Sequence, residues 1–187
     1  MQIRIELFSE WQCGSGLSSG SDVDLLAIKD SHGFPFIPGR TLKGLLADAA
    51  SQLERVAGDS QGDWNEFRKV CFGRESSRSD GGSESGCLFV SNAELGGATR
   101  QEIKAAALAA HLFRKRSGTK IDDQGQAEEH TLRRMEVAVP MSLYGSIEGC
   151  PPPYLDHLEK CMMWVKQLGS QRHRGMGRCH ITIEEKA

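Results

Sequence analysis

The chain has 187 residues, a formal net charge of −2 at pH 7 and 39% hydrophobic residues. This length fits one domain with a substantial core, and the near-neutral charge excludes a bulk polycation, so nucleic-acid binding would need local basic patches. No apolar run is long enough to span a bilayer and the alternating Met1–Phe8 stretch is unlike a signal peptide, so we expect a cytoplasmic protein.

The six cysteines form no Cys-x-x-Cys pair. Without a secretory signal we expect no disulfide framework. A zinc site built from Cys13, Cys71, Cys87 and a histidine is a weak alternative, because structural zinc sites usually contain closely spaced ligand pairs. Cys87 and Cys161 lie in apolar stretches and are expected in the core.

The chain begins with a strand and a long loop. Residues 2–8 alternate between polar and apolar side chains, which predicts a half-buried strand. A polar loop at 13–22 precedes the apolar run Val23–Ile28, in which Asp24 is the one acid. The next segment, Phe34–Gly39, contains two prolines that hold the preceding residues in extended conformations.

The first helix is expected from about Leu42 to Val56, with Thr41 as its cap. Arg40 and Lys43 lie at its N-terminal end, where free N–H groups and the helix dipole add positive potential. This end is therefore a candidate phosphate site. The alternative is an ordinary amphipathic helix whose first-turn cations are solvated.

The middle of the chain alternates between ordered and polar stretches. A short helix is expected around Trp64 and Phe72, a mobile loop over Arg74–Gly86, and a second strand over Cys87–Leu95. Gln101 to Arg116 begins with an alanine-rich helical pattern and becomes basic near its end, where Arg114 lies.

The segment after this helix reads as a hairpin. Thr119–Ala127, which contains Lys120, has the composition of a hairpin tip. Strand character resumes over His130–Tyr144, with weak alternation over Glu136–Tyr144. Arg133 and Arg134 lie near the start of this stretch. Because adjacent strand residues face opposite ways, we expect one of these two arginines to meet a bound nucleic acid.

A last helix is expected over Tyr154–Leu168 and a last strand over His180–Ile183. Between them lies a loop with three arginines and two glycines, and no acid occurs between Glu159 and Glu184. Glycine lets a partner approach the backbone closely, and the arginine fork suits phosphate. The loop is a candidate polyanion site, whereas the alternative is a turn with solvated charges. The candidate contacts are Arg172, His173, Arg174, Gly175, Gly177 and Arg178.

The expected order is strand, helix, strand, excursion, strand, helix, strand, which is the order of a ferredoxin-like (RRM-like) α+β fold. We expect residues 1–187 to form a single domain, with 101–140 as an insertion within it. Because this fold hosts many functions, the site has to carry the functional argument.

Four segments resemble the repeat-associated mysterious protein (RAMP) superfamily, in the right order and over nearly the whole chain. Arg172–Arg178 resembles its glycine-rich signature loop, and Phe34–Gly44 resembles the approach to its first helix. Cys71–Gly73 with Gly86–Ala93 resembles its helix-end and second-strand pair. Thr119–Ala127 through Glu136–Pro140 resembles the thumb hairpin of backbone subunits in type III CRISPR effector complexes.

The resemblance implies a modified ferredoxin-like palm with a protruding thumb β-hairpin. It implies subunits that stack into a filament along a CRISPR guide RNA, grip the sugar–phosphate backbone and meet the target RNA and other subunits of the complex. In subunits that cut target RNA, an aspartate in the loop after the first strand is required, and Asp24 matches that place. A carboxylate there could position a divalent cation, Mg²⁺ or Mn²⁺, at the scissile phosphate. No organic cofactor and no membrane partner are implied.

Three other functions remain open. A binding-only backbone subunit would use the same basic surfaces without cleavage by Asp24. A stand-alone ribonuclease that matures the guide precursor would use metal-independent acid–base chemistry by a histidine such as His173. A metabolite-binding domain of the same fold would leave the basic stretch Arg114–Lys120 unexplained.

Overall fold

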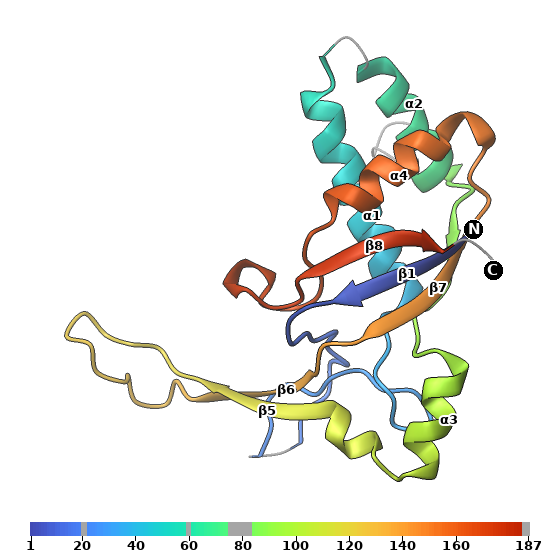
Figure 1. The fold of residues 1–187 in the computed structure, drawn as a ribbon. Coiled ribbons are helices and arrows are strands. Elements are labelled where there is room, and N and C mark those ends of the chain that lie inside the picture. Colours follow the sequence, from blue (N-terminus) through green and yellow to red (C-terminus); the bar gives the residue numbers. More distant parts are fainter. Residues whose placement is uncertain (20–21, 59–60, 75–83, 185–187) are drawn as a thin grey trace.

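A four-stranded antiparallel sheet forms the centre of the protein, which we describe from a computed structural model for residues 1–19, 22–58, 61–74 and 84–184. The sheet has the spatial order β4-β7-β1-β8 (Figure 1). Its strands are β1 (Gln2–Leu7), β4 (Phe89–Val90), β7 (Ser142–Glu148) and β8 (Cys179–Glu184). The strand predicted at 2–8 is confirmed: Ile3, Ile5 and Leu7 are buried.

Three helices lie on one side of this sheet, with α1 and α4 next to it and α2 outside them (Figure 1). They are α1 (Gly39–Val56), α2 (Gln61–Phe72) and α4 (Leu155–Trp164), the last preceded by the short 3₁₀ turn η3 (Pro152–Tyr154). The ring of His157 on α4 lies 4.6 Å from that of Trp64 and 5.4 Å from that of Phe67, both on α2. These aromatic contacts hold the outer helix α2 against α4. No helix of the described residues is long and apolar enough to cross a membrane.

A second, two-stranded sheet extends away from the body of the protein (Figure 1). It consists of β5 (Phe113–Gly118) and β6 (Arg133–Ala138), which pair antiparallel from Phe113 opposite Ala138 to Gly118 opposite Arg133. The tip between them contains the bridge Ile121–Ala127, so the hairpin tip predicted at Thr119–Ala127 is confirmed. Because little covers it, nearly every side chain from Arg114 to Leu132 is exposed.

The first helix begins three residues earlier than expected. Its N-cap is Pro38, no side chain caps it, and the Thr41 N–H donates to the Pro38 carbonyl at 2.9 Å. The prediction that Thr41 caps this helix is therefore wrong. The side chain that serves this end is remote in sequence: Asn92 Oδ1 accepts the Gly39 N–H at 2.9 Å.

Two other boundaries differ from the sequence prediction. The helix expected from Gln101 to Arg116 is α3 (Gly97–Ala105), followed by the 3₁₀ turn η2 (Ala109–Leu112), so Arg114 lies on a strand. The strand expected over Glu136–Tyr144 is two strands in different sheets. The chain leaves β6 after Ala138 and enters β7 at Ser142, and Pro140 between them has no N–H to continue a ladder.

Two smaller expectations concern the segment after α2 and the last helix. Of the loop predicted at Arg74–Gly86, residues 75–83 lie outside the described residues. On its two sides β2 (Gly73–Arg74) pairs with β3 (Glu84–Ser85). The last helix ends at Trp164, four residues before the predicted end. Cys161 is buried as expected, but Cys87 is exposed, so its expected place in the core is wrong.

Two glycines of α1 give a test of these contacts with opposite expected signs. A Cβ at Gly39 would lie 2.0 Å from the Val90 carbonyl oxygen, whereas a Cβ at exposed Gly44 would meet nothing within 4 Å. We expect Gly39→Ala to lower the free energy of unfolding by about 1–3 kcal/mol. Gly44→Ala should raise it by about 0.5–1 kcal/mol, because alanine is the better helix former. Urea unfolding measures both, and a stable Gly39→Ala protein would contradict the close approach.

Candidate nucleic-acid interface

Left-handed backbone conformations shape the glycine-rich loop. Its 3₁₀ turn η4 (Arg172–Arg174) lies between two left-handed residues, Gln171 at φ 56° and Gly175 at φ 83°. Gly177 has φ 65°, and a Cβ there would lie 1.8 Å from the Leu168 carbonyl oxygen. Packing and backbone conformation therefore both require glycine at position 177.

The segment Phe8–Gln12, which continues β1, holds this loop in place. The Phe8 N–H donates to the Arg178 carbonyl, the Gly177 N–H to the Glu10 carbonyl, and the Ser170 N–H to the Gln12 carbonyl, each at 2.8 Å. The loop is thus fixed by its backbone, while its cationic side chains remain available. His173, Arg174 and Arg178 are exposed and Arg172 is half-buried.

The same segment joins the loop to the base of the hairpin. Trp11 exchanges two backbone hydrogen bonds with Ala138 of β6, at 3.1 and 2.8 Å. Met176 of the loop is buried in a small cluster with Met135 and Val137 of β6. Two candidate regions that are far apart in sequence are therefore adjacent in space.

The β6 register assigns the hairpin arginines to opposite faces. Arg133 shares a face with Met135 and Val137, which pack against the loop residue Met176, whereas Arg134 lies on the other face. Both arginines are exposed. The alternation agrees with the expectation that a ligand on one side would meet one of these arginines, and Arg133 is the one on the loop side.

The cations of this region differ in how far they are neutralised. Arg114 and Arg116 share the Glu10 carboxylate at 3.5 and 3.3 Å, and Lys120 pairs with Glu128 at 2.6 Å. These exposed pairs are weak, so a phosphate could replace the carboxylate. Within the described part of the chain, six candidate arginines take part in no ion pair: Arg40, Arg133, Arg134, Arg172, Arg174 and Arg178.

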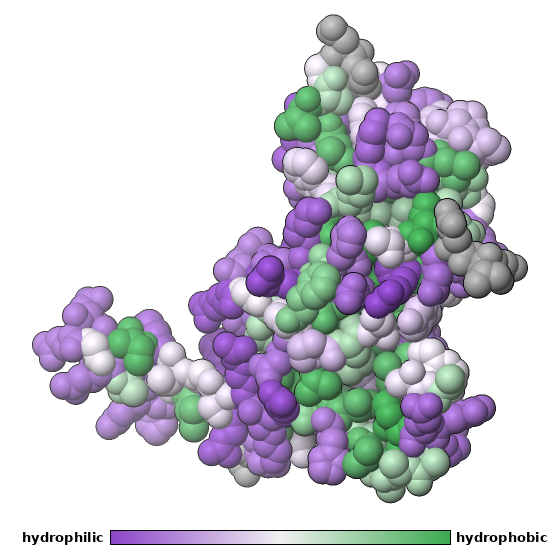
Figure 2. Space-filling model, in the orientation of Figure 1, coloured by the Kyte–Doolittle hydropathy of each residue, from purple (hydrophilic) through white to green (hydrophobic). Residues whose placement is uncertain are grey.

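Polar side chains dominate the protruding hairpin on the face shown in Figure 2, with a few apolar groups near its tip. The exposed apolar residues there are Ile121, 55% exposed, and Leu132, 56% exposed. The polar stem of such a hairpin can lie along a nucleic-acid backbone, and its apolar end can contact an uncharged surface such as a base or another protein.

The N-terminal end of α1 has fewer free donors for a phosphate than the sequence suggested. Arg40 is exposed, but the Lys43 ammonium group donates to the Leu88 carbonyl at 2.7 Å, and Asn92 already accepts the first N–H of the helix. The polar contacts of this end are with the segment around β4. Arg40 is thus its free cation among the described residues, and Lys43 serves mainly to hold α1 against that segment.

Asp24 lies beside the base of the hairpin, bound to the β6 backbone. Its side chain is exposed, its Oδ2 accepts the Arg134 N–H at 2.7 Å, and its own N–H donates to the Arg134 carbonyl at 2.9 Å. The nearby acid Asp22 pairs with Lys115 at 2.6 Å. That hydrogen bond and the charge of Lys115 lower the pKa of Asp22. Asp22 is thus paired with a cation, whereas Asp24 takes part in no ion pair among the described residues.

A metal at Asp24 would depend on ligands from outside the protein. No group of three or more His, Cys, Asp or Glu side chains among the described residues is arranged to hold a metal ion. This leaves the zinc alternative with Cys13, Cys71 and Cys87 without support. Mg²⁺ often binds through one carboxylate together with phosphate oxygens and water, and a lone exposed Asp24 fits that mode.

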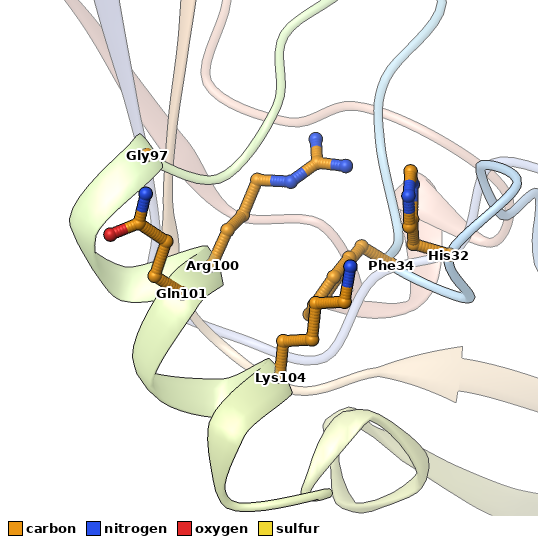
Figure 3. A pocket seen from close by; sticks show the side chains of 6 residues that line it. All are labelled: His32, Phe34, Gly97, Arg100, Gln101 and Lys104. Atoms are coloured by element: carbon orange, nitrogen blue, oxygen red, sulfur yellow. The ribbon is translucent and has the colours of Figure 1, made fainter.

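A hollow of about 290 Å³ between α3 and the loop before α1 was not anticipated from the sequence (Figure 3). Arg100 of α3 pairs with Asp30 and, at 2.8 Å, with Glu94, and its guanidinium lies 5.0 Å from the centre of the Phe34 ring. Lys104 and His32 extend toward the same space (Figure 3). The sequence held no signal for this ion pair or the hollow beside it, because Asp30 and Arg100 are 70 positions apart.

The arrangement of unpaired arginines on a clamped loop, next to a protruding basic hairpin, defines a nucleic-acid-binding type of surface. The sequence model of the RAMP superfamily matches residues 4–180. The chain therefore belongs to the RAMP superfamily, as the sequence resemblance indicated. No curated protein matches the chain.

Two solved structures have a similar fold. One is a chain of a Type III-B Cmr-beta complex bound to cognate target RNA, with a TM-score of 0.68, 11% identity, and coverage of 96% of this chain and 95% of that one. The other belongs to the apo state of Type III-B Cmr-beta, with a TM-score of 0.64, 13% identity, and coverage of 97% and 95%. At this identity the similarity establishes the fold alone.

The Asp30–Arg100 contact gives a pH prediction. Burial alone would raise the pKa of Asp30, but the N–H groups of Phe34 and His32, at 2.9 and 2.8 Å, and the Arg100 charge outweigh it and lower the pKa. A lowered folded pKa stabilises the protein fully above the unfolded value of about 3.9, and this is lost as the pH falls through the folded pKa. Asp30→Asn should therefore cost about 1–3 kcal/mol at pH 7, and this cost should fall as the pH drops through the folded pKa of Asp30.

Chemical denaturation at several pH values measures this difference. Asp156→Asn is the matched control: Lys160 in the next helical turn also lowers the pKa of that carboxyl, but the pair is exposed, so the loss should be small at every pH. An equal loss for Asp30→Asn at both ends of the pH range would contradict the assigned role.

Proposed function

We propose that this protein is a guide-RNA-binding backbone subunit of a type III CRISPR ribonucleoprotein complex. The observation that carries the proposal is the clamped loop Gln171–Arg178, whose arginines have no acidic partner among the described residues and which packs against the hairpin base. Family membership and the fold of the Cmr-beta chains support it. The RNA and complex partners of those chains are thereby proposed for this one.

The proposed architecture is a modified ferredoxin-like palm with a thumb. The sheet order β4-β7-β1-β8, with helices α1 and α4 between its strands along the chain, supports the palm. The protruding β5–β6 hairpin, within the insertion 101–140, is the proposed thumb. Residues 1–187 form one domain in this proposal, and copies or paralogues stack along the guide.

The proposed grip on the guide is electrostatic and independent of sequence. Arg172, Arg174 and Arg178 present planar donor groups that suit phosphate oxygens, and Arg133 extends the same surface onto the hairpin. Such contacts fix the path of the RNA and leave the base edges free for pairing with a target.

Target cleavage by Asp24 is the proposed chemistry. The 2′-hydroxyl of the nucleotide before the cut gives up its proton to solvent and attacks the adjacent phosphorus, and the 5′-oxygen of the next nucleotide leaves in line with it. The leaving 5′-oxygen takes a proton from solvent, so the products are a 2′,3′-cyclic phosphate and a 5′-hydroxyl. Asp24, fixed by the Arg134 N–H at the hairpin base, would hold a divalent cation beside the scissile phosphate. When bound, Mg²⁺ or Mn²⁺ supplies positive charge that offsets the charge developing on the phosphate oxygens.

A binding-only subunit is the second candidate, and one observation favours it. One oxygen of Asp24 is already engaged by the β6 backbone, which gives this residue a structural role without any chemistry. The third candidate, a guide-processing ribonuclease, has less support. Among the described residues the one side-chain hydrogen bond of a histidine is between Ser31 and His32, at 3.3 Å, so no histidine is oriented by a titratable partner.

Charge reversal in the loop tests the guide-binding surface. We expect Arg174→Glu combined with Arg178→Glu to weaken binding of single-stranded RNA at least about tenfold and to reduce the slope of log K against log salt by roughly 1.4, or 0.7 per lost phosphate contact. The measurement is fluorescence anisotropy over a salt series. Arg55→Glu is the control, because Arg55 is an exposed cation in the last turn of α1. Equal effects of the two changes would remove the loop from the interface.

Substitution of Asp24 tests the chemistry in the reconstituted complex. Asp24→Asn keeps an oxygen acceptor for the Arg134 N–H but removes the charge, so the hairpin base should stay intact while target cleavage falls at least about 100-fold. Asp24→Ala should abolish cleavage as well, with guide RNA retained in both variants. Asp22→Ala is the control and should still cleave. Full cleavage by Asp24→Asn with guide bound would leave the binding-only subunit as the function.

A further inference from the structure

The face of the central sheet that points away from α1, α2 and α4 (Figure 1) is largely polar. Among the described residues it contains two large aromatic side chains, Tyr144 of β7 and, on the edge strand β4, Phe89, which lies opposite Glu148 and is 60% exposed. On the two central strands, Arg4 of β1 lies opposite Tyr144 of β7. Tyr144 and Arg4 are both half-buried, so each is partly accessible. Four-stranded sheets of this order can bind single-stranded RNA by stacking bases on aromatic side chains of the two central strands.

A hollow of about 350 Å³ adjoins Tyr144 at the edge of this face. It lies between β7 and the segment after β4, and its lining includes Gln2, Asn92, Glu94 and Ser146. Its volume is at the lower end of the range for small-ligand sites, which suits a single ring system.

The charge of the described lining does not favour a phosphate as the occupant. Among the described residues that line this hollow there is no lysine and no arginine, but there is the carboxylate of Glu94. Arg100 engages one oxygen of Glu94, Oε2, at 2.8 Å from outside the lining. A neutral, flat ligand with hydrogen-bonding edges fits a site with one aromatic wall and uncharged polar groups.

Polar groups around the hollow have hydrogen-bond donors and acceptors that are free to bind such a ligand. Asn92 Oδ1 is taken by the Gly39 N–H, so its amide nitrogen is the end with donors left to give. Gln2 is exposed and can donate or accept. The Tyr144 ring lies close to the Gly96 backbone, because a Cβ on Gly96 would be 3.3 Å from its Cε2 atom. A side chain at position 96 would press on that ring, so glycine leaves it room.

We propose that this hollow holds one nucleobase of single-stranded RNA, stacked on Tyr144 and hydrogen-bonded by Asn92 and Gln2. The inference rests on the proposed function in that the chain must bind RNA. It adds a base-contacting site to surfaces that contact phosphate alone. It also connects the sheet face with α1, since Asn92 caps the first N–H of the helix on which Arg40 lies.

The test compares two probes on the full chain: a short oligoadenylate, and an oligomer of equal length whose sugar–phosphate units carry no bases. We expect the wild type to bind oligoadenylate more tightly. Tyr144→Leu should weaken oligoadenylate binding roughly 5- to 100-fold and leave the abasic oligomer unaffected, because stacking on one ring is lost. Tyr144→Phe should bind both probes like the wild type, because the ring remains.

The outcomes separate this site from the proposed function. Arg174→Glu with Arg178→Glu should weaken both probes equally, since neither arginine contacts a base. Binding of both probes by the wild type, with unchanged oligoadenylate affinity in Tyr144→Leu, overturns the base site and leaves the proposed function intact. Failure of the wild type to bind either probe overturns both.

A second measurement covers the case in which Tyr144→Leu disturbs the sheet. RNA that carries 4-thiouridine is crosslinked by light to the wild-type protein, and the attached peptides are identified by mass spectrometry. Crosslinks to the peptide that contains Ser142–Glu148 support the site. Crosslinks confined to the hairpin and the glycine-rich loop overturn it.

Discussion

The segment Phe8–Gln12 is the physical connection on which the candidate interface depends. Its alternate residues form hydrogen bonds in two directions, with Phe8, Glu10 and Gln12 bonded to the glycine-rich loop and Trp11 bonded to the hairpin. Because the segment continues the central strand β1, both regions are anchored to the most buried part of the sheet. The orientation of loop and hairpin is therefore set by backbone contacts and not by the charged side chains.

This division leaves the cations free to act on a ligand. In the loop Gly177 makes the close backbone contact, whereas Arg174 and Arg178 extend into solvent. On the hairpin Glu10 holds Arg114 and Arg116 only weakly, through exposed pairs. A polyanion that displaces Glu10 would gain both arginines, which is how a near-neutral protein can present a locally basic surface.

Local patterns in the sequence gave correct predictions where they were strong. The alternation at residues 2–8, the apolar face of α1 and the polar tip at Thr119–Ala127 each follow from the period of a strand, a helix or a turn. Element ends were predicted less well. Thr41 is a residue type that often caps helices, but the first N–H of α1, that of Gly39, donates to the side chain of Asn92, 53 positions later in the chain. The strand expected over Glu136–Tyr144 is broken, because its two halves pair with partners in different sheets.

By itself, the sequence determined which residue types are available: a loop of arginines and glycines without a neighbouring acid, a basic hairpin, and an isolated aspartate in an apolar run. It also determined the family, because the motifs occur in a fixed order. Only the tertiary structure decided which charges are neutralised and which regions meet. Lys43 is tied to Leu88, Asp22 to Lys115, and Met176 to the hairpin base, all across long separations. The physical reason is that ion pairing and burial depend on distance in space, which local periodicity does not encode.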